Sequence, residues 1–322
     1  MTNISENTDL RGTAFLFPGQ GAQAVGMGTE LYQKFESVKN LFHDVDEAIG
    51  IPLSRIFMEG PEEELRRTIN AQPAILVVSL ACLMAFRETV EASQIPRPNY
   101  MAGHSLGEYT ALVAAGSISP TDAALLVRER GRLMQEASDR VPSGMAAIIG
   151  LDESVVEAIC QETGTQVSNV NSSEQLVIAG ERLALARALD LATARGAGRA
   201  IPLRVSGAFH SVLMNSAMVG MQNVIKETDF QDPDVPIVAN SSAEPLTKKQ
   251  EIKEELVKQI CSCVQWKNSV NFMVNSGVSH FIEIGPGQVL SGLVKRICDN
   301  AHTDNLNDLS SVQNFNLDWK LE

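Results

Sequence analysis

A glycine-flanked serine motif, GHSLG at residues 103–107, constrains this chain more than any other feature. It follows a short apolar run at 100–102 and precedes a helical pattern from 106 to 115 that ends at Gly116. This order predicts a strand, a sharp turn and a helix, which would push the hydroxyl of Ser105 into the open. The first N–H groups of the helix would then face the place where an oxyanion forms. The motif favours a nucleophilic serine, although a G-x-S-x-G match alone is a weak signal.

A serine hydroxyl needs a base before it can act as a nucleophile. The chain offers five histidines: His43, His104, His210, His280 and His302. His104 adjoins the serine on the same turn, so we assign it to packing or hydrogen bonding. Three others lie in a charged helical stretch, at the start of a strand and in the C-terminal tail. His210 follows a strand in a loop of small residues, VSGAFHS at 205–211, and is therefore the predicted base for Ser105.

Strand and helix patterns alternate at both ends of the chain, with strands expected at 13–17, 236–239 and 280–284. Alternation of this kind predicts an α/β fold around a central, mostly parallel sheet. We expect a hydrolase-like large subdomain built from two separate stretches, residues 1–137 and 203–300. Residues 301–322 are rich in Asn, Asp and Ser, and this composition predicts a mobile tail.

The middle of the chain has a different order of patterns. Between residues 138 and 202 the expected elements follow the sequence β-α-β-β-α-β. That order is typical of a ferredoxin-like fold. We therefore predict a small ferredoxin-like subdomain, inserted between the two halves of the larger one.

Composition narrows the function classes. The formal net charge of −13 argues against nucleic-acid partners and against attachment to anionic membranes. The N-terminal residues lack the apolar core of a signal peptide, so a cytoplasmic location is expected. Cys261 and Cys263 form a close pair, but two further ligands near them are missing, and no metal site is expected.

Eight stretches of the chain resemble the malonyl-CoA:acyl carrier protein transacylases of fatty acid synthesis and the acyltransferase domains of polyketide synthases. They occur in the family's order and cover roughly residues 13–298. The stretches are FPGQGAQ at 17–23, GHSLGEY at 103–109, RERGRLMQEA at 128–137, MAAIIGL at 145–151, QLVIAG at 175–180, GAFHS at 207–211, VQW at 264–266 and EIGPGQVLSGL at 283–293. Together they form a highly specific match.

The resemblance implies a role for each matching residue. Ser105 would be acylated and His210 would take its proton, while the backbone N–H groups of Gln20 and Leu106 would form the oxyanion hole. Arg130 would bind the free carboxylate of a malonyl group, for which a bidentate guanidinium is well suited. A coenzyme A thioester would be the substrate rather than a cofactor, and no metal or organic cofactor is implied. The partners would be malonyl-CoA and an acyl carrier protein.

Two further roles follow from the resemblance. In this family a main-chain carbonyl orients the histidine, and Gln265 of the VQW stretch matches that position. Phe209 would crowd the α-carbon of the acyl group and disfavour a methyl branch, by about 1–3 kcal/mol. Lys267, Lys295 and Arg296 are candidates for a local basic patch that would meet an acidic carrier protein or coenzyme A.

Three alternatives stay open. A serine esterase or thioesterase would share the GHSLG motif, but such hydrolases place their histidine near the chain end and have no evident use for Arg130. A catalytically inactive binding module would be expected to have lost Ser105, His210 or Arg130. Within the family, the chain could serve fatty acid synthesis or act as a free-standing acyltransferase of a polyketide pathway.

Overall fold

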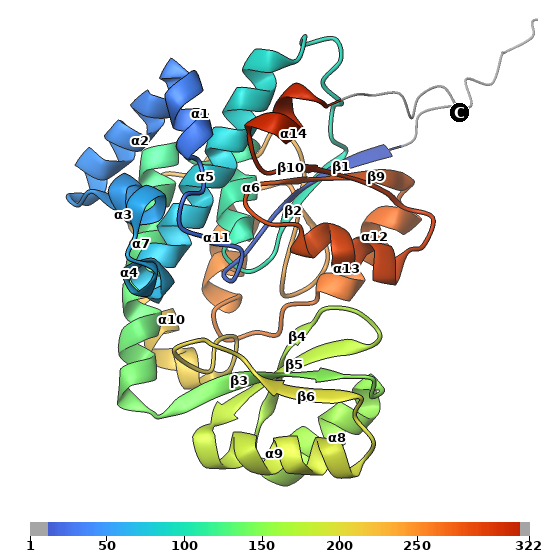
Figure 1. The fold of residues 1–322 in the computed structure, drawn as a ribbon. Helices are drawn as coiled ribbons and strands as arrows, with labels where there is room; N and C mark the ends of the chain where they lie inside the picture. The colour runs from blue at the N-terminus through green and yellow to red at the C-terminus, as the bar shows by residue number, and fades with distance from the viewer. Residues whose placement is uncertain (1–11, 316–322) are drawn as a thin grey trace, which may run out of the picture.

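A computed structural model describes residues 12–315 and places a six-stranded sheet at the centre of the larger part (Figure 1). Its strand order is β10-β9-β1-β2-β7-β8, and every pair is parallel except β7 with β8. A mixed α/β fold with a mostly parallel central sheet was predicted, and this is confirmed. The strands are β1 (Gly12–Phe17), β2 (Tyr100–Gly103), β7 (Ile237–Val238), β8 (Pro245–Leu246), β9 (Val278–Ile284) and β10 (His302–Leu306).

Helices cover both faces of this sheet, as a parallel sheet requires. Alternate residues of β1 point to opposite faces: Phe15 and Phe17 join one apolar cluster, whereas Ala14 and Leu16 join another. Helices α12 (Trp266–Asn275) and α13 (Val289–Ile297) cover the second face. The first face is covered by α2 (Glu36–Ile49), α5 (Thr68–Thr89), α6 (Gly107–Ala114), α7 (Pro120–Arg140), α10 (Asn215–Glu227) and α11 (Lys249–Lys258).

Shorter helices complete the outer layer. They are α1 (Thr29–Lys34), α3 (Leu53–Glu59), α4 (Glu62–Arg66), α14 (Leu309–Gln313) and a 3-10 turn at Val212–Met214.

Helix α5 runs through the middle of the larger part and is buried along almost its whole length. It is the one helix among the described residues that is long and apolar enough to cross a membrane, yet 89% of that apolar window is buried inside the protein. The sequence pattern placed its start at Pro73, but the helix begins five residues earlier, at Thr68. Thr68 and Gln72 are polar and nevertheless buried, so the apolar run alone underestimated the helix.

A second sheet holds the middle of the chain and is antiparallel, with strand order β4-β5-β3-β6. The predicted β-α-β-β-α-β order of elements is present. The elements are β3 (Ser143–Ile149), α8 (Glu153–Thr163), β4 (Gln166–Val170), β5 (Gln175–Glu181), α9 (Arg182–Ala194) and β6 (Arg199–Pro202). Both helices pack on the face directed away from the central sheet, so the other face of the small sheet is turned toward the larger part (Figure 1).

The C-terminal segment differs from the mobile tail predicted for residues 301–322. Residues 302–306 form β10, which pairs in parallel with β9 at the edge of the central sheet. Helix α14 follows and packs against α5, and the rings of Phe86 and Phe315 meet edge to face at 4.7 Å. The prediction was wrong for this stretch because an edge strand needs backbone pairing more than apolar side chains. Residues 316–322 lie outside the described part of the chain.

Candidate active site

Ser105 stands at the turn between β2 and α6, in the strand-turn-helix context that the sequence predicted. Its φ is 54°, in the left-handed region that residues other than glycine seldom adopt. The turn is tight enough to require glycine on both sides. A Cβ on Gly103 would lie 1.9 Å from the carbonyl carbon of Gly107, and one on Gly107 would lie 2.1 Å from the carbonyl oxygen of Phe17. The two glycines therefore let β1, β2 and α6 converge beneath the serine.

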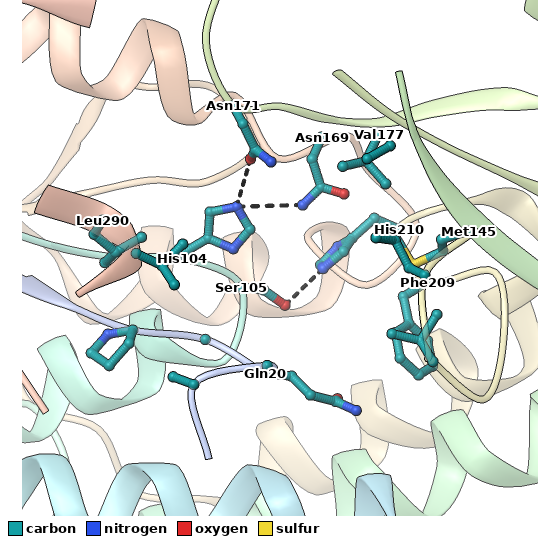
Figure 2. Close-up of a pocket in the computed structure, with 18 of the residues that line it drawn as sticks. Gln20, His104, Ser105, Met145, Asn169, Asn171, Val177, Phe209, His210 and Leu290 are labelled. Atoms are coloured by element: carbon teal, nitrogen blue, oxygen red, sulfur yellow. Dashed lines mark hydrogen bonds between the residues drawn. The ribbon is translucent and has the colours of Figure 1, made fainter. Parts of the chain in front are cut away.

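His210 is the histidine that meets this serine. Its Nε2 lies 2.7 Å from the Ser105 Oγ (Figure 2). Its Nδ1 lies 2.8 Å from the carbonyl oxygen of Gln259. A carbonyl can only accept, so Nδ1 carries the hydrogen and Nε2 is left to accept the serine proton. Burial, and secondly the charge of Arg130, lowers the pKa of His210 to about 3. The imidazole is therefore neutral, as a general base must be.

The carbonyl that orients His210 differs from the one predicted. Gln265 begins helix α12, where its carbonyl accepts the N–H of Ser269 at 2.9 Å. Gln259 instead lies at the end of α11, where helix carbonyls lack partners within their own helix. Its carbonyl accepts the N–H of Ser262 at 3.3 Å and the closer Nδ1 of His210 at 2.8 Å, so the assignment to Gln265 was wrong.

The predicted oxyanion donors, Gln20 and Leu106, both belong to the loops around the serine. Gly19 packs closely on the serine turn, since a Cβ there would lie 2.4 Å from the carbonyl oxygen of His104. Within residues 12–315 neither the Gln20 N–H nor the Leu106 N–H donates a hydrogen bond to the protein. The Ser105 N–H, in contrast, is already donated to the Asn240 side chain at 2.7 Å. Two free donors beside the serine hydroxyl suit a developing oxyanion.

Arg130 extends from α7 into the same site and is only 1% exposed. Its Nη1 donates to Gln72 Oε1 at 2.8 Å, and its Nη2 donates to Gln259 Oε1 at 2.8 Å and to Ser105 Oγ at 3.1 Å. No carboxylate in the described part of the chain lies within ion-pair distance of it, and burial lowers its pKa. The neighbouring Arg132 is different, because its side chain is 42% exposed and paired with Glu129. A buried cation without a counter-ion is costly and indicates a ligand anion.

A cavity of about 280 Å³ joins these groups and lies between the two sheets. Met145, Ala147 and Val177 of the small sheet line it, as does Phe209, which is 5% exposed. Figure 2 shows the side chains of Met145, Val177 and Phe209 around the serine and its histidine. His104 also lines the cavity, but its Nε2 bonds Asn171 Oδ1 at 2.9 Å rather than the serine. The hydrogen-bonding role predicted for His104 is present in this contact.

The three residues of the suggested basic patch lie on α12 and α13. Lys267 is already paired with Glu153 at 2.6 Å, and Arg296 donates to Gln175 Oε1 at 2.8 Å. The first contact joins the larger part to helix α8, the second joins it to strand β5, and Lys295 is exposed. Among residues 12–315 no group of three or more His, Cys, Asp or Glu side chains is arranged to hold a metal ion.

Several functional residues escaped the sequence analysis. Gln72 and Gln259 hold Arg130 by their side chains, and Asn240 holds the serine backbone. Asn240 had a usable signal, because a polar residue directly after a strand of a parallel sheet stands where ligand sites gather. Gln259 lies within a predicted helix and Gln72 lies just before one, and neither position carries such a signal.

A neutral histidine, a serine that lines the cavity, two free N–H donors and a buried guanidinium can together form and break a serine ester of an acyl group that carries an anion. Fold and site thus define a serine-dependent acyl transferase or hydrolase. The family model described as the acyl transferase domain matches residues 14–314. The chain belongs to this family.

Named relatives agree over nearly the full length. A protein of Bacillus subtilis (strain 168), named malonyl CoA-acyl carrier protein transacylase, is 45% identical over 93% of this chain and 95% of its own. A crystal structure of an acyl-carrier-protein-S-malonyltransferase from Bartonella henselae has a TM-score of 0.89 and 39% identity, covering 94% of this chain and 97% of its own. A malonyl-transacylase solved with a holo type II polyketide synthase acyl-carrier protein has a TM-score of 0.89 and 40% identity, with the same coverage.

Proposed function

We propose that this protein transfers a malonyl group from malonyl-CoA to the phosphopantetheine thiol of an acyl carrier protein, through an ester on Ser105. One observation carries the proposal: a buried arginine without a counter-ion, Arg130, lies 3.1 Å from the serine oxygen that His210 contacts. A simple acyl group gives such a cation nothing to bind, whereas the free carboxylate of malonyl does. The names of the relatives support the same substrate and partner.

In the first half-reaction His210 Nε2 takes the proton of Ser105 while Oγ attacks the thioester carbonyl. The oxyanion accepts hydrogen bonds from the N–H groups of Gln20 and Leu106. When the intermediate collapses, the carbon–sulfur bond breaks, His210 gives its proton to the leaving sulfur, and coenzyme A departs as the thiol. Arg130 holds the malonyl carboxylate and exchanges its contact with Oγ for one with the substrate.

The second half-reaction runs the same steps with the carrier as nucleophile. His210 takes the proton of the phosphopantetheine thiol, and the thiolate attacks the ester carbonyl on Ser105. The carbon–oxygen bond to the serine then breaks, and Oγ recovers the proton from His210. The order is ping-pong, and it needs no metal or organic cofactor because coenzyme A enters only as the substrate's leaving group.

The proposed pathway is fatty acid synthesis. A free-standing role in a polyketide pathway is the second candidate, favoured by the likeness to a malonyl-transacylase solved with a polyketide carrier protein. Comparing transfer rates to the two kinds of holo carrier protein from one organism distinguishes these roles.

The proposal extends to architecture and location. We assign residues 12–137 and 203–315, including β10, to a hydrolase-like large subdomain, and 138–202 to a ferredoxin-like subdomain. The elbow geometry at Ser105 supports the first assignment, and the β4-β5-β3-β6 strand order supports the second. The burial of α5 inside the protein argues against a membrane span, and we propose a cytoplasmic location.

Intact-protein mass spectrometry tests the function directly. Brief incubation with malonyl-CoA should add one malonyl group, and holo acyl carrier protein should then remove it and gain the same mass. Ser105→Ala should form no adduct. An adduct that decays at the same rate with and without carrier would point to a hydrolase instead, and an adduct formed only with other acyl-CoA thioesters would overturn the substrate.

A further inference from the structure

Asn240 lies two residues after the end of β7 and is 2% exposed. Its side chain makes two hydrogen bonds to the serine turn. Oδ1 accepts the N–H of Ser105 at 2.7 Å, and Nδ2 donates to the carbonyl oxygen of Gly103 at 2.7 Å. One planar amide thus bridges the residue before the turn and the nucleophile itself.

These contacts decide where the serine hydroxyl points. Ser105 has a φ of 54°, a conformation that costs about 1 kcal/mol or more and persists only when its surroundings enforce it. Its N–H is held by Asn240, and its carbonyl oxygen accepts Gln259 Nε2 at 2.9 Å. Because the N–H of Ser105 is occupied, the next N–H along the chain, that of Leu106, is the one left to face the cavity.

The backbone of Asn240 is itself held on both sides. Its N–H donates to Glu108 Oε1 at 2.9 Å, and its carbonyl accepts the N–H of Gln265 at 2.7 Å. Glu108 belongs to α6, the helix that starts at the serine turn, and Gln265 begins α12. Asn240 therefore joins three elements that are far apart in sequence, and its side chain has little freedom to adjust.

We propose that Asn240 is a positioning residue for the reaction: its amide fixes the backbone of the nucleophile, so that Oγ meets His210 and the Leu106 N–H stays free for the oxyanion. The acyl-transfer measurement of this inference rests on the proposed function. The reactivity of Ser105 itself does not, because a small electrophile measures it independently of malonyl.

The first test is Asn240→Ala, compared with Asn70→Ala as a matched control. Asn70 belongs to α5, is 4% exposed and donates to the backbone carbonyl of Glu64 at 2.8 Å. Its replacement by alanine therefore has the structural cost of losing a buried amide that bonds to the backbone, without the contacts to the serine turn. Loss of alignment by about 1 Å lowers rates roughly 100-fold. We expect the single-turnover acylation rate of Asn240→Ala to fall by about that factor, with the KM for malonyl-CoA changed by no more than about threefold.

The second readout is the rate at which phenylmethylsulfonyl fluoride modifies Ser105, which needs the serine and its base but no carboxylate recognition. It should fall in Asn240→Ala by a factor similar to the acylation rate and stay unchanged in Asn70→Ala. If the wild type transfers no malonyl, the proposed function fails while this readout still tests Asn240. If the wild type transfers malonyl and Asn240→Ala loses no more than the control in either assay, the positioning role is refuted.

Asn240→Asp keeps the shape and provides a test should the alanine variant not fold. A neutral carboxyl can donate to Gly103 and accept from Ser105 as the amide does, whereas an ionised one would repel the Gly103 oxygen. Buried Glu108 and nearby Glu255 face this position, and Arg130 lies across the turn. Acylation by Asn240→Asp should therefore approach the wild-type rate at pH 5 and fall as the pH rises to 9. A profile parallel to wild type would overturn the proposal.

Discussion

Replacement of Arg130 by methionine removes the guanidinium while filling most of its volume. Two charge-assisted hydrogen bonds to a carboxylate are worth about 1.5–3 kcal/mol each, or about 3–6 kcal/mol together. At about 1.4 kcal/mol for each factor of ten, kcat/KM for malonyl-CoA should fall by about 10²–10⁴-fold. Acetyl-CoA has no carboxylate to lose, so its transfer should change little or rise.

The protein should remain folded in this variant. Arg130 is buried without a counter-ion, and replacing a buried charge by an apolar side chain is often neutral or stabilising. The side chains of Gln72 and Gln259 would each lose one partner, which offsets part of that gain. Thermal unfolding followed by circular dichroism separates a loss of transfer from a loss of structure.

The assay is steady-state transfer to holo acyl carrier protein with malonyl-CoA and acetyl-CoA in parallel. Arg132→Met is the matched control, because Arg132 lies two residues away on the same helix and is paired with Glu129 on the surface. Arg130→Lys keeps the charge without the fork and should retain part of the malonyl preference. Equal losses for both thioesters would refute the assignment of Arg130 to the carboxylate.

Three other expectations follow from the geometry. Because the pKa of His210 is lowered to about 3, the acylation rate measured by stopped flow should stay level from pH 8 to 5, whereas a histidine with an ordinary pKa near 6.5 would lose about thirtyfold. The stability that the neutral His210 contributes is present above pH 6.5 and is lost as the pH falls toward 3, which urea melts measure. Phe209→Ala should raise methylmalonyl transfer relative to malonyl by about 10-fold or more in competition assays, and no change would exclude Phe209 as the steric filter. Gly107→Ala should cost about 3 kcal/mol in urea melts because its Cβ would meet the Phe17 carbonyl, whereas Gly292→Ala, in a helix with open space around it, should gain about 0.5–1 kcal/mol.

The serine turn and its base were predictable because they depend on local rules. Glycines on both sides of a serine, between an apolar run and a helix, describe a turn whose geometry follows from short-range sterics. His210 was found by excluding the other histidines, and the structure brings it to the serine. The helix start at Thr68 was missed because buried polar residues do not show in an apolar pattern.

Contacts between distant segments could not be predicted in this way. The carbonyl that orients His210 belongs to Gln259 rather than Gln265, and only the ending of α11 beneath the site decides between them. The backbone at that position does not depend on which side chain it carries, so residue type holds no signal for the role. Strand β10 was missed for a related reason, since its polar side chains say nothing of the neighbour that supplies its hydrogen bonds.

The site retains features that cost stability. Ser105 and His210 have φ values of 54° and 56°, and each such conformation costs about 1 kcal/mol or more for a residue with a Cβ. Arg130 adds a buried charge without a carboxylate partner among the described residues. One residue, Gln259, contacts all three of these residues. Its Oε1 accepts from Arg130, its backbone carbonyl accepts from His210, and its Nε2 donates to the Ser105 carbonyl. Since neutral amides hold the arginine without neutralising it, its charge stays available to the substrate, which a structural carboxylate at the same place would prevent.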